Sequence, residues 1–424
     1  MYKFKWNNKL GALAVIGILA MGNWAQTLAT DTKTTQTEKS QAAQAAQAAD
    51  MALYTRVITN IAGKKIPNRS NGTVGNKMIQ RYLVGHFKEI ALTPPCDEKF
   101  TQEHIYYEKK IINVVGAIPG VGQLKDQWLI IGGHYDHIGS GLLGMGNDTG
   151  KIYPGADDNA SGTAGVILLS KSIKEQVDIM DDANRRSILF CCFDAEEIGL
   201  FGSKMIADNL ADFGIKDAGS VIAMLNMDMI GRVRDKEIHV FATGTAKQWN
   251  AILDKASIGI DLDIQRDTRI FGQSDHASFI KHDIPVLFFN SGLHKDFHST
   301  RDTVDKINFT GAVKTVNLIE NIALELIKRD QMLSKIKPNT LGVGMMDNKN
   351  RANDILQISS IAPDSVAAKA GLQKGDELLQ WQGKPINNFK HLRLLINQAQ
   401  KDTNIKLTIQ RSGKEMSINI RFTG

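Results

Sequence analysis

The stretch "SILFCCFDAEEIGLFGS", residues 187–203, joins an apolar run to a cluster of acidic residues. Its first seven residues, 187–193, have the apolar and aromatic content of a buried β-strand. Asp194, Glu196 and Glu197 follow almost at once, although carboxylates are rare beside such a strand unless something compensates their charge. Taken alone, the acidic cluster is more typical of a solvated loop between a strand and a helix. Its interpretation therefore depends on what the neighbouring segments bring to it.

Short apolar runs of the same kind recur between residues 52 and 333, with helical patterns between several of them. We expect strands at 111–115, 128–131, 188–193, 221–225 and 286–289, and helices over 160–173 and 309–327. Strands that are buried on both faces and alternate with helices indicate an α/β fold. The sequence therefore predicts a domain over residues 52–333 with a mostly parallel central sheet flanked by helices.

Almost every predicted strand is followed by a side chain that can bind a metal. In open α/β sheets, ligands bind beyond the carboxyl ends of the strands, so these side chains are expected to meet at one edge. The segments are "GGHYDHIG" with His134 and Asp136, "PGADDNASG" with Asp157 and Asp158, "DAEE" with Glu196 and Glu197, "NMDMIG" with Asp228, and "NSGLHKDFHST" with His294 and His298. Five such segments at one edge favour a functional site over a set of solvated loops.

A cation is the simplest reason for so many carboxylates to gather. Without one, mutual repulsion and desolvation would make the cluster very costly. Imidazole nitrogens together with carboxylate oxygens suit zinc, and one aspartate can bridge two ions about 3.5–4 Å apart. Asp136 lies two residues after His134, on the same face of an extended chain, so it can orient the imidazole from behind.

These motifs, together with "QSDHASF" at residues 273–279, resemble the co-catalytic di-zinc aminopeptidases exported by bacteria. The clan also includes glutaminyl cyclases and glutamate carboxypeptidases, and the resemblance covers residues 52–333. It implies the zinc aminopeptidase fold, two Zn²⁺ per chain and peptides with free N-termini as substrates. It also implies a ligand set in which His134 and Asp228 bind one zinc, Glu197 and His298 bind the other, and Asp157 bridges both.

The same resemblance implies how the reaction runs. Glu196 would be the general base, taking a proton from a metal-bridging water, the nucleophile, and passing it to the leaving amine. This agrees with the chemistry, because peptide hydrolysis needs a base near the water that is not itself a ligand. Asp275, His276 and Phe271 would line the substrate site. Family members often carry a tyrosine where Phe271 stands, so the donor that stabilises the oxyanion is left open.

Other histidines and arginines of the domain are not expected to bind metal. We expect His137, His282 and His294 to be ordinary surface residues, although His294 lies close to His298 in sequence. Arg232 and Arg269 are the candidates for a cation that would bind a substrate carboxylate, but neither lies in one of the motifs.

Three alternatives remain beside the aminopeptidase. A mono-zinc, glutaminyl cyclase-like acyltransferase would share the fold, and a carboxypeptidase would need a fixed cation for the substrate carboxylate. An inactive peptide-binding protein would lack a ligand or the base, and neither is missing. The acidic cluster suits the ammonium group of a free N-terminus, which favours the aminopeptidase. The chain has no Gly-x-Ser-x-Gly elbow and no Walker loop.

The C-terminal residues, 338–424, form a separate β-rich unit in the sequence pattern. "LGVGM" at 341–345 and "IAPDSVAAKAGLQKGDELLQWQGKPI" at 361–386 resemble a PDZ domain of the bacterial protease-associated kind. The resemblance implies that the backbone amides of Leu341, Gly342, Val343 and Gly344 bind the terminal carboxylate of a peptide, which adds a strand to the sheet. The alternative is a module that docks on the catalytic domain and binds no peptide.

The N-terminal segment predicts export. Residues 1–29 have the layout of a secretory signal peptide, with a basic start, a short apolar stretch and cleavage after Ala25 or Ala29. Residues 30–51, rich in Thr, Gln and Ala, form a low-complexity linker. Removal of residues 1–25 takes away three lysines and lowers the formal net charge from +6 to +3, which gives no indication of nucleic acid binding. We expect a periplasmic or secreted protein without a stable membrane span.

Overall fold

The computed structural model describes residues 41, 44–66, 68–106, 108–139, 150–181, 183–270, 272–336, 339–347, 356–400 and 402–423. The expected signal peptide, most of the expected linker and Phe271 lie outside these residues. The first described helix covers residues 44–62.

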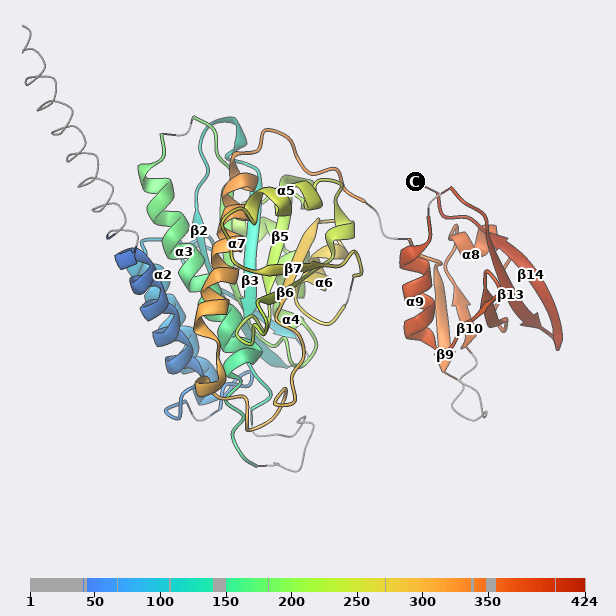
Figure 1. Cartoon of the computed structure of the whole chain (residues 1–424), viewed down its shortest axis with the longest axis horizontal. Helices are drawn as coiled ribbons and strands as arrows, with labels where there is room; N and C mark the ends of the chain where they lie inside the picture. The colour runs from blue at the N-terminus through green and yellow to red at the C-terminus, as the bar shows by residue number, and fades with distance from the viewer. Residues whose placement is uncertain are drawn as a thin grey trace, which may run out of the picture. The chain divides into compact units, whose positions relative to one another are not determined.

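A mixed eight-stranded sheet forms the centre of the N-terminal domain (Figure 1). Four neighbouring strands in its middle run parallel, in the order β4 (Ser187–Phe193), β3 (Trp128–His134), β5 (Val221–Met227) and β8 (Val286–Asn290). Antiparallel pairings add β2 (Lys109–Ile118) and β1 (Thr101–Tyr106) at one side, and β6 (Glu237–Phe241), followed by its parallel neighbour β7 (Asp263–Arg266), at the other. The predicted α/β class with a mostly parallel centre is confirmed.

Helices cover both faces of this sheet. One group consists of α2 (Val74–Glu89), α3 (Gly162–Ile179) and α7 (Phe309–Lys328), with α5 (Trp249–Ala256) packed on α7. The other consists of α4 (Phe201–Asp208) and α6 (His276–Ile280), which contact each other and strands β2, β5 and β8. The core beside α4 and α6 includes Leu189, Cys191 and Phe193 of β4 but not the residues between them, as expected for a strand buried on both faces.

Close backbone contacts bring α3 to the carboxyl ends of the parallel strands. The turn Ala156–Ser161 leads into α3, whose first residue is Gly162. A Cβ atom at Gly162 would lie 2.3 Å from the carbonyl oxygen of Met227, and one at Gly133 would lie 2.6 Å from the same oxygen. Only glycine fits at these two positions, so the sequence "GGH" and the glycine of "NASG" position the segment that carries Asp157 and Asp158.

The C-terminal domain is a separate antiparallel sheet with two helices. Its strands pair in the order β14 (Lys414–Ile420), β13 (Ile405–Arg411), β11 (Glu377–Trp381), β10 (Leu356–Ile361) and β9 (Val343–Asp347), with β12 (Lys384–Pro385) paired to β11. The helices are α8 (Val366–Lys369) and α9 (Phe389–Gln398). A core of its own, with Leu356, Ile358, Leu392 and Leu407 among its members, holds the unit together. The predicted small β-rich domain is confirmed.

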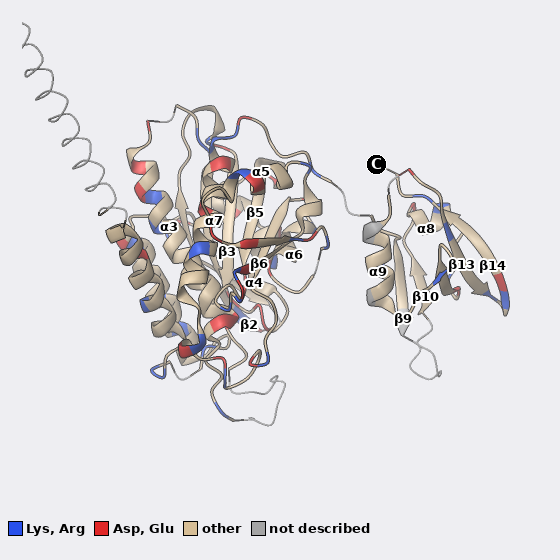
Figure 2. Ribbon diagram, viewed as in Figure 1, with Lys and Arg blue, Asp and Glu red and all other residues tan. Residues whose placement is uncertain are grey.

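Charged residues are spread over the described chain. Lys and Arg positions are interspersed with Asp and Glu positions in the ribbon (Figure 2).

Among the described residues, no helix combines the length and the apolar character that crossing a membrane requires.

Candidate metal centre

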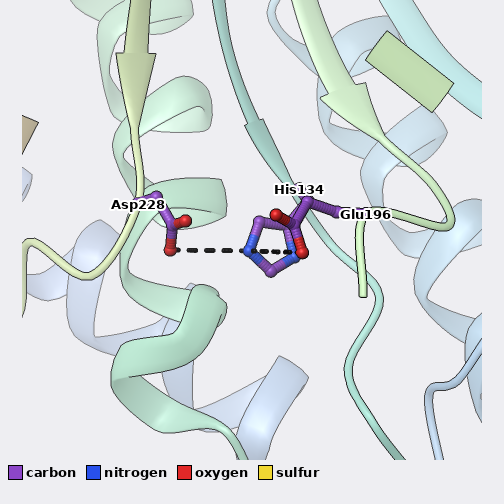
Figure 3. A group of neighbouring side chains, drawn as sticks. All are labelled: His134, Glu196 and Asp228. Atoms are coloured by element: carbon purple, nitrogen blue, oxygen red, sulfur yellow. Dashed lines mark ion pairs between the residues drawn. The ribbon is translucent and has the colours of Figure 1, made fainter. Parts of the chain in front are cut away.

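Three predicted site residues meet at the carboxyl ends of three parallel strands. His134 is the last residue of β3, Asp228 directly follows β5, and Glu196 lies three residues beyond β4. Their side chains point toward one another from these separate elements (Figure 3). The strand order β4-β3-β5 places them side by side although they are far apart in the chain.

His134 and two carboxylates form the first half of the site. The Nε2 atom of His134 lies 3.4 Å from Oδ1 of Asp158 and 3.5 Å from Oδ1 of Asp228. This ring nitrogen is buried and makes a hydrogen bond of ordinary geometry with neither oxygen. Ligand atoms about 2.0–2.2 Å from one tetrahedral zinc would be roughly 3.3–3.6 Å apart, so the observed separations fit a shared cation.

His298 and two carboxylates form the second half. The Nε2 atom of His298 lies 2.9 Å from Oδ2 of Asp158 and 3.2 Å from Oε2 of Glu197. The ring of Phe297 stacks on the imidazole with the ring centroids 3.8 Å apart. Asp158 therefore presents one oxygen to each histidine, and this is the arrangement expected of a carboxylate that bridges two ions.

Asp157, which the sequence analysis placed in the bridging position, points elsewhere. Its Oδ1 accepts hydrogen bonds from the N–H of Gly231, at 2.7 Å, and from the hydroxyl of Ser161, at 3.1 Å. Its Oδ2 lies 3.1 Å from Nε2 of His294. Neighbouring residues of this turn project to different sides, so only Asp158 reaches both His134 and His298. Asp158, and not Asp157 as the sequence analysis expected, is therefore the aspartate that faces both His134 and His298.

Two histidines that were expected on the surface are buried at the site. Nδ1 of His137 lies 2.7 Å from Oε1 of Glu197, and the His137 side chain is fully buried. His294 is buried against Asp157. His282, in contrast, is partly exposed and pairs with Asp208, so it lies at the surface as expected. His137 lies three residues after His134, and this short spacing at the end of a strand was the signal that could have identified it.

We expect His137→Ala to weaken zinc binding about tenfold to a hundredfold, because Glu197 loses the partner that fixes its orientation. The measurement is a zinc titration against a competing chelator. His282→Ala, which also removes a histidine from a carboxylate, is the matched control and should bind zinc like the unchanged chain. Equal effects of the two substitutions would assign no role to His137.

Asp136 connects the histidine of the first half to the pair of glutamates. Its Oδ1 lies 3.5 Å from Nδ1 of His134 and accepts the N–H of Glu196 at 3.1 Å, while its Oδ2 accepts the N–H of Glu197 at 3.4 Å. One buried carboxylate thus faces the back of the imidazole and holds the main chain that carries both glutamates. The expected orienting position of Asp136 agrees with this geometry.

The loops that carry these residues contain backbone conformations that are rare for residues other than glycine. Ala195, Met229 and His298 have φ values of 57°, 59° and 49°. Each belongs to a loop that follows a parallel strand and carries a site residue. Such conformations persist only where surrounding contacts enforce them, and they cluster at functional sites. The amide of Asn290, for example, donates to the carbonyl of Asp228 at 2.8 Å and secures the Met229 turn.

The electrostatics of the site favour additional positive charge. Burial raises the pKa of Glu196 well above its ordinary value, and it also raises the pKa of Asp228. Burial alone would lower the pKa of His298, but hydrogen bonds to Asp158 and Glu197 raise it to about 10. These shifts are those of a buried cluster in which carboxylates gather around few cations. The donor set and its charge therefore fit bound divalent cations.

The remaining predicted residues lie as follows. Asp275 is buried, and this burial raises its pKa to about 7, with Asp228 and Asp136 adding to the shift. His276 stacks on Phe288 with the ring centroids 4.5 Å apart. Phe271, the third residue of the expected substrate group, lies outside the described residues.

The two arginines considered for carboxylate recognition already have acidic partners. Arg232 donates to Asp296 at 2.7 Å and to the carbonyl of Lys306 at 3.0 Å. Arg269 pairs with Asp267. Neither guanidinium belongs to the histidine–carboxylate groups described above.

Comparisons with known sequences match two separate regions of the chain. The sequence model of peptidase family M28 matches residues 113–323, and that of the PDZ domain matches residues 339–422. Leucine aminopeptidase 1 of Arthroderma otae is 26% identical over 232 residues, which make up 51% of this chain and 58% of that protein. The chain thus spans little more than half the length of this curated relative.

Two solved structures share the fold. The LapA aminopeptidase of Legionella pneumophila superposes with a TM-score of 0.53 and 22% identity, over 66% of this chain and 72% of that one. The glutaminyl cyclase of Porphyromonas gingivalis gives a TM-score of 0.53 and 16% identity, over 65% of this chain and 98% of that one. Because these two proteins are named for different reactions, the shared fold alone does not select one of them.

Proposed function

We propose that this chain is a zinc-dependent aminopeptidase with a peptide-binding module, because residues 113–323 match the sequence model of peptidase family M28 and residues 339–422 match that of the PDZ domain. It removes single residues from peptides with a free N-terminus. The observation that supports this most strongly is the pair of histidine–carboxylate sets that share Asp158, with Glu196 beside them.

The donor atoms divide naturally into two zinc sites. His134, Asp158 and Asp228 would hold one ion, and His298, Asp158 and Glu197 would hold the other. When bound, such ions polarise the substrate carbonyl and lower the pKa of water. His137 and Asp136 would keep the glutamate and imidazole ligands in place.

Glu196 is the residue suited to proton transfer. Its Oε2 lies 4.0 Å from Nε2 of His134, farther than the oxygens of Asp158 and Asp228, so its carboxylate is the least tied to that imidazole. Its elevated pKa, which results mainly from burial, makes it a stronger base than an ordinary glutamate. In the proposed reaction it accepts a proton from the attacking water and then delivers it to the leaving amine.

The charge around the site favours attack at the amino end of a peptide. Carboxylates outnumber the histidines here, which suits a substrate ammonium group. A carboxypeptidase would instead need a fixed cation for the substrate carboxylate, and the two candidate arginines are already paired with Asp296 and Asp267.

The direction of attack can be tested with leucyl- and alanyl-anilides beside N-blocked dipeptides. We expect zinc-dependent release of aniline from the anilides and no cleavage of the blocked dipeptides. Cleavage of the blocked dipeptides alone would replace the aminopeptidase by a carboxypeptidase.

The proposed PDZ function rests on the loop before β9. Gly342 has a φ of 74° and its carbonyl accepts the N–H of Ala362 at 2.8 Å, while the carbonyl of Leu341 accepts the N–H of Ala367 at 2.9 Å. These bonds anchor the loop against the start of α8. β9 is the last strand in the described order of this sheet, so a peptide can add beside it.

A fluorescence polarisation experiment separates peptide binding from simple docking. We expect peptides with an apolar C-terminal residue and a free carboxylate to bind more tightly than the same peptides with an amidated end. Equal and negligible affinity of both forms would support the docking module instead.

The cellular location that we propose is outside the cytoplasm. Support comes from the signal-like pattern of residues 1–29, which precedes the described part of the chain.

A further inference from the structure

Arg69 is a buried cation whose hydrogen bonds all go to main-chain carbonyls around the metal centre. It lies before α2 and is only 2% exposed. Its Nε donates to the carbonyl of Tyr135 at 3.1 Å, and its Nη2 donates to the carbonyls of Gly155, at 2.8 Å, and Asp158, at 2.9 Å. Its Nη1 donates to the carbonyl of Pro154. One planar guanidinium therefore ties the end of β3 to the turn that carries the bridging aspartate.

Asp302 accepts hydrogen bonds from the main-chain N–H groups of the same turn. Its Oδ2 accepts the N–H of Asp157 at 2.9 Å and that of Asp158 at 3.0 Å, and its carbonyl accepts the N–H of Ala156 at 3.1 Å. Asp302 belongs to the segment that follows His298. The peptide units around Asp158 are thus fixed on the carbonyl side by Arg69 and on the N–H side by Asp302.

Gly155 is the residue that permits this close arrangement. It has a φ of 58°, and a Cβ atom there would lie 2.2 Å from the carbonyl oxygen of Asp158 and 2.6 Å from Nη2 of Arg69. No side chain fits between the guanidinium and the turn. The fit between Arg69 and the main chain of Asp158 is therefore tight as well as hydrogen-bonded.

We propose that Arg69 is a positioning residue that preorganises the bridging carboxylate of Asp158 for two metal ions. It acts through the main chain and contacts no ligand atom. Its charge also attracts the carboxylates of Asp158, Asp136 and Glu197, so it offsets part of their mutual repulsion. This inference rests on the proposed metal-dependent function. Arg69 lies outside the region that matches the peptidase family.

Arg186 provides a matched control. It is fully buried, and it donates to the carbonyl of Leu326 at 2.8 Å and to Oε1 of Gln127 at 2.9 Å. It directly precedes β4, so the length of that strand, about 20 Å, separates it from the acidic end. Both arginines are buried cations that bind main-chain carbonyls, but only Arg69 borders the metal centre.

The experiment compares zinc affinity in the unchanged chain, Arg69→Lys and Arg186→Lys, by titration against a competing chelator. Lysine keeps the charge but lacks the fork of donors. We expect Arg69→Lys to lower zinc affinity about tenfold or more, while Arg186→Lys leaves it unchanged even if it lowers the melting temperature. Equal zinc affinity of all three proteins would refute the role of Arg69. Failure of the unchanged chain to bind zinc would refute the proposed metalloenzyme itself.

A second pair of variants covers the case in which Arg69→Lys does not fold. Gly155→Ala places a methyl group 2.2 Å from the carbonyl oxygen of Asp158, 2.6 Å from Nη2 of Arg69 and 2.7 Å from Cδ2 of His137. Gly214→Ala introduces alanine at a similar φ of 71° with no atom within 4 Å of the new Cβ. Both place alanine at a positive φ, so the difference between them reports the contacts that are displaced around the turn. We expect only Gly155→Ala to weaken zinc binding, and equal effects of the two would overturn the inference.

Discussion

Replacing Glu196 with glutamine is expected to lower kcat about 10²–10⁴-fold while zinc remains bound. Glutamine keeps the size and shape of the side chain but cannot accept the proton of the attacking water. The loss corresponds to roughly 3–5 kcal/mol in the activation barrier. The measurement is steady-state hydrolysis of leucyl-anilide by zinc-saturated protein, with zinc content determined on the same sample.

The neighbouring glutamate gives the contrast that makes this result specific. Glu197→Gln should lower zinc occupancy as well as kcat, because Glu197 contacts both His298 and His137. The exposed Glu175, which pairs with Lys171 on α3, provides a Glu→Gln control that should change neither quantity. A near-normal kcat for Glu196→Gln would remove Glu196 from the role of base, and loss of zinc would make it a ligand.

The second large effect is expected from Asp158→Asn. The unchanged chain should bind two zinc ions, and the variant should lose tight binding at both sites, since each histidine loses the same bridging partner. Asp157→Asn should retain both ions but lose about 1–3 kcal/mol of stability, because its buried oxygens accept hydrogen bonds from Gly231 and Ser161. Elemental analysis after dialysis and urea unfolding distinguish the two variants.

The stoichiometry also separates the proposed enzyme from its nearest alternative. A single tightly bound zinc in the unchanged chain would favour the mono-zinc, glutaminyl cyclase-like acyltransferase. Loss of zinc from Asp157→Asn but not from Asp158→Asn would restore the bridging position that the sequence motif first indicated.

The sequence predicts the sheet and the edge at which the site forms, because these depend on regular patterns. Buried strands show as apolar runs, and the rule that ligands lie beyond the carboxyl ends of parallel strands then locates His134, Glu197 and Asp228 together. The choice between Asp157 and Asp158 depends instead on the direction of two adjacent side chains in an irregular turn. No residue pattern encodes that direction.

Other parts of the site leave little trace in the sequence for a similar reason. The positive φ values of Ala195 and Met229 occur at residues other than glycine, so nothing in the composition marks them. Arg69 acts only on main-chain carbonyls, whose positions follow from the fold and not from side-chain identity. His137 was expected at the surface, and only its proximity to His134 in the chain could have indicated its place beside Glu197.

The positions of the proposed ligands along the chain indicate whether folding or zinc binding comes first. Each histidine–carboxylate set combines residues that lie far apart in the chain, and the nearest two in sequence, His134 and Asp158, are separated by residues 135–157. An unfolded chain therefore does not hold either ligand set together, and closing such loops costs conformational entropy before any ion is held. Zinc should bind the native state almost exclusively and stabilise it by mass action, about 2.7 kcal/mol per site at a free concentration of 100 Kd. Metal loading is then expected to follow the folding of the sheet.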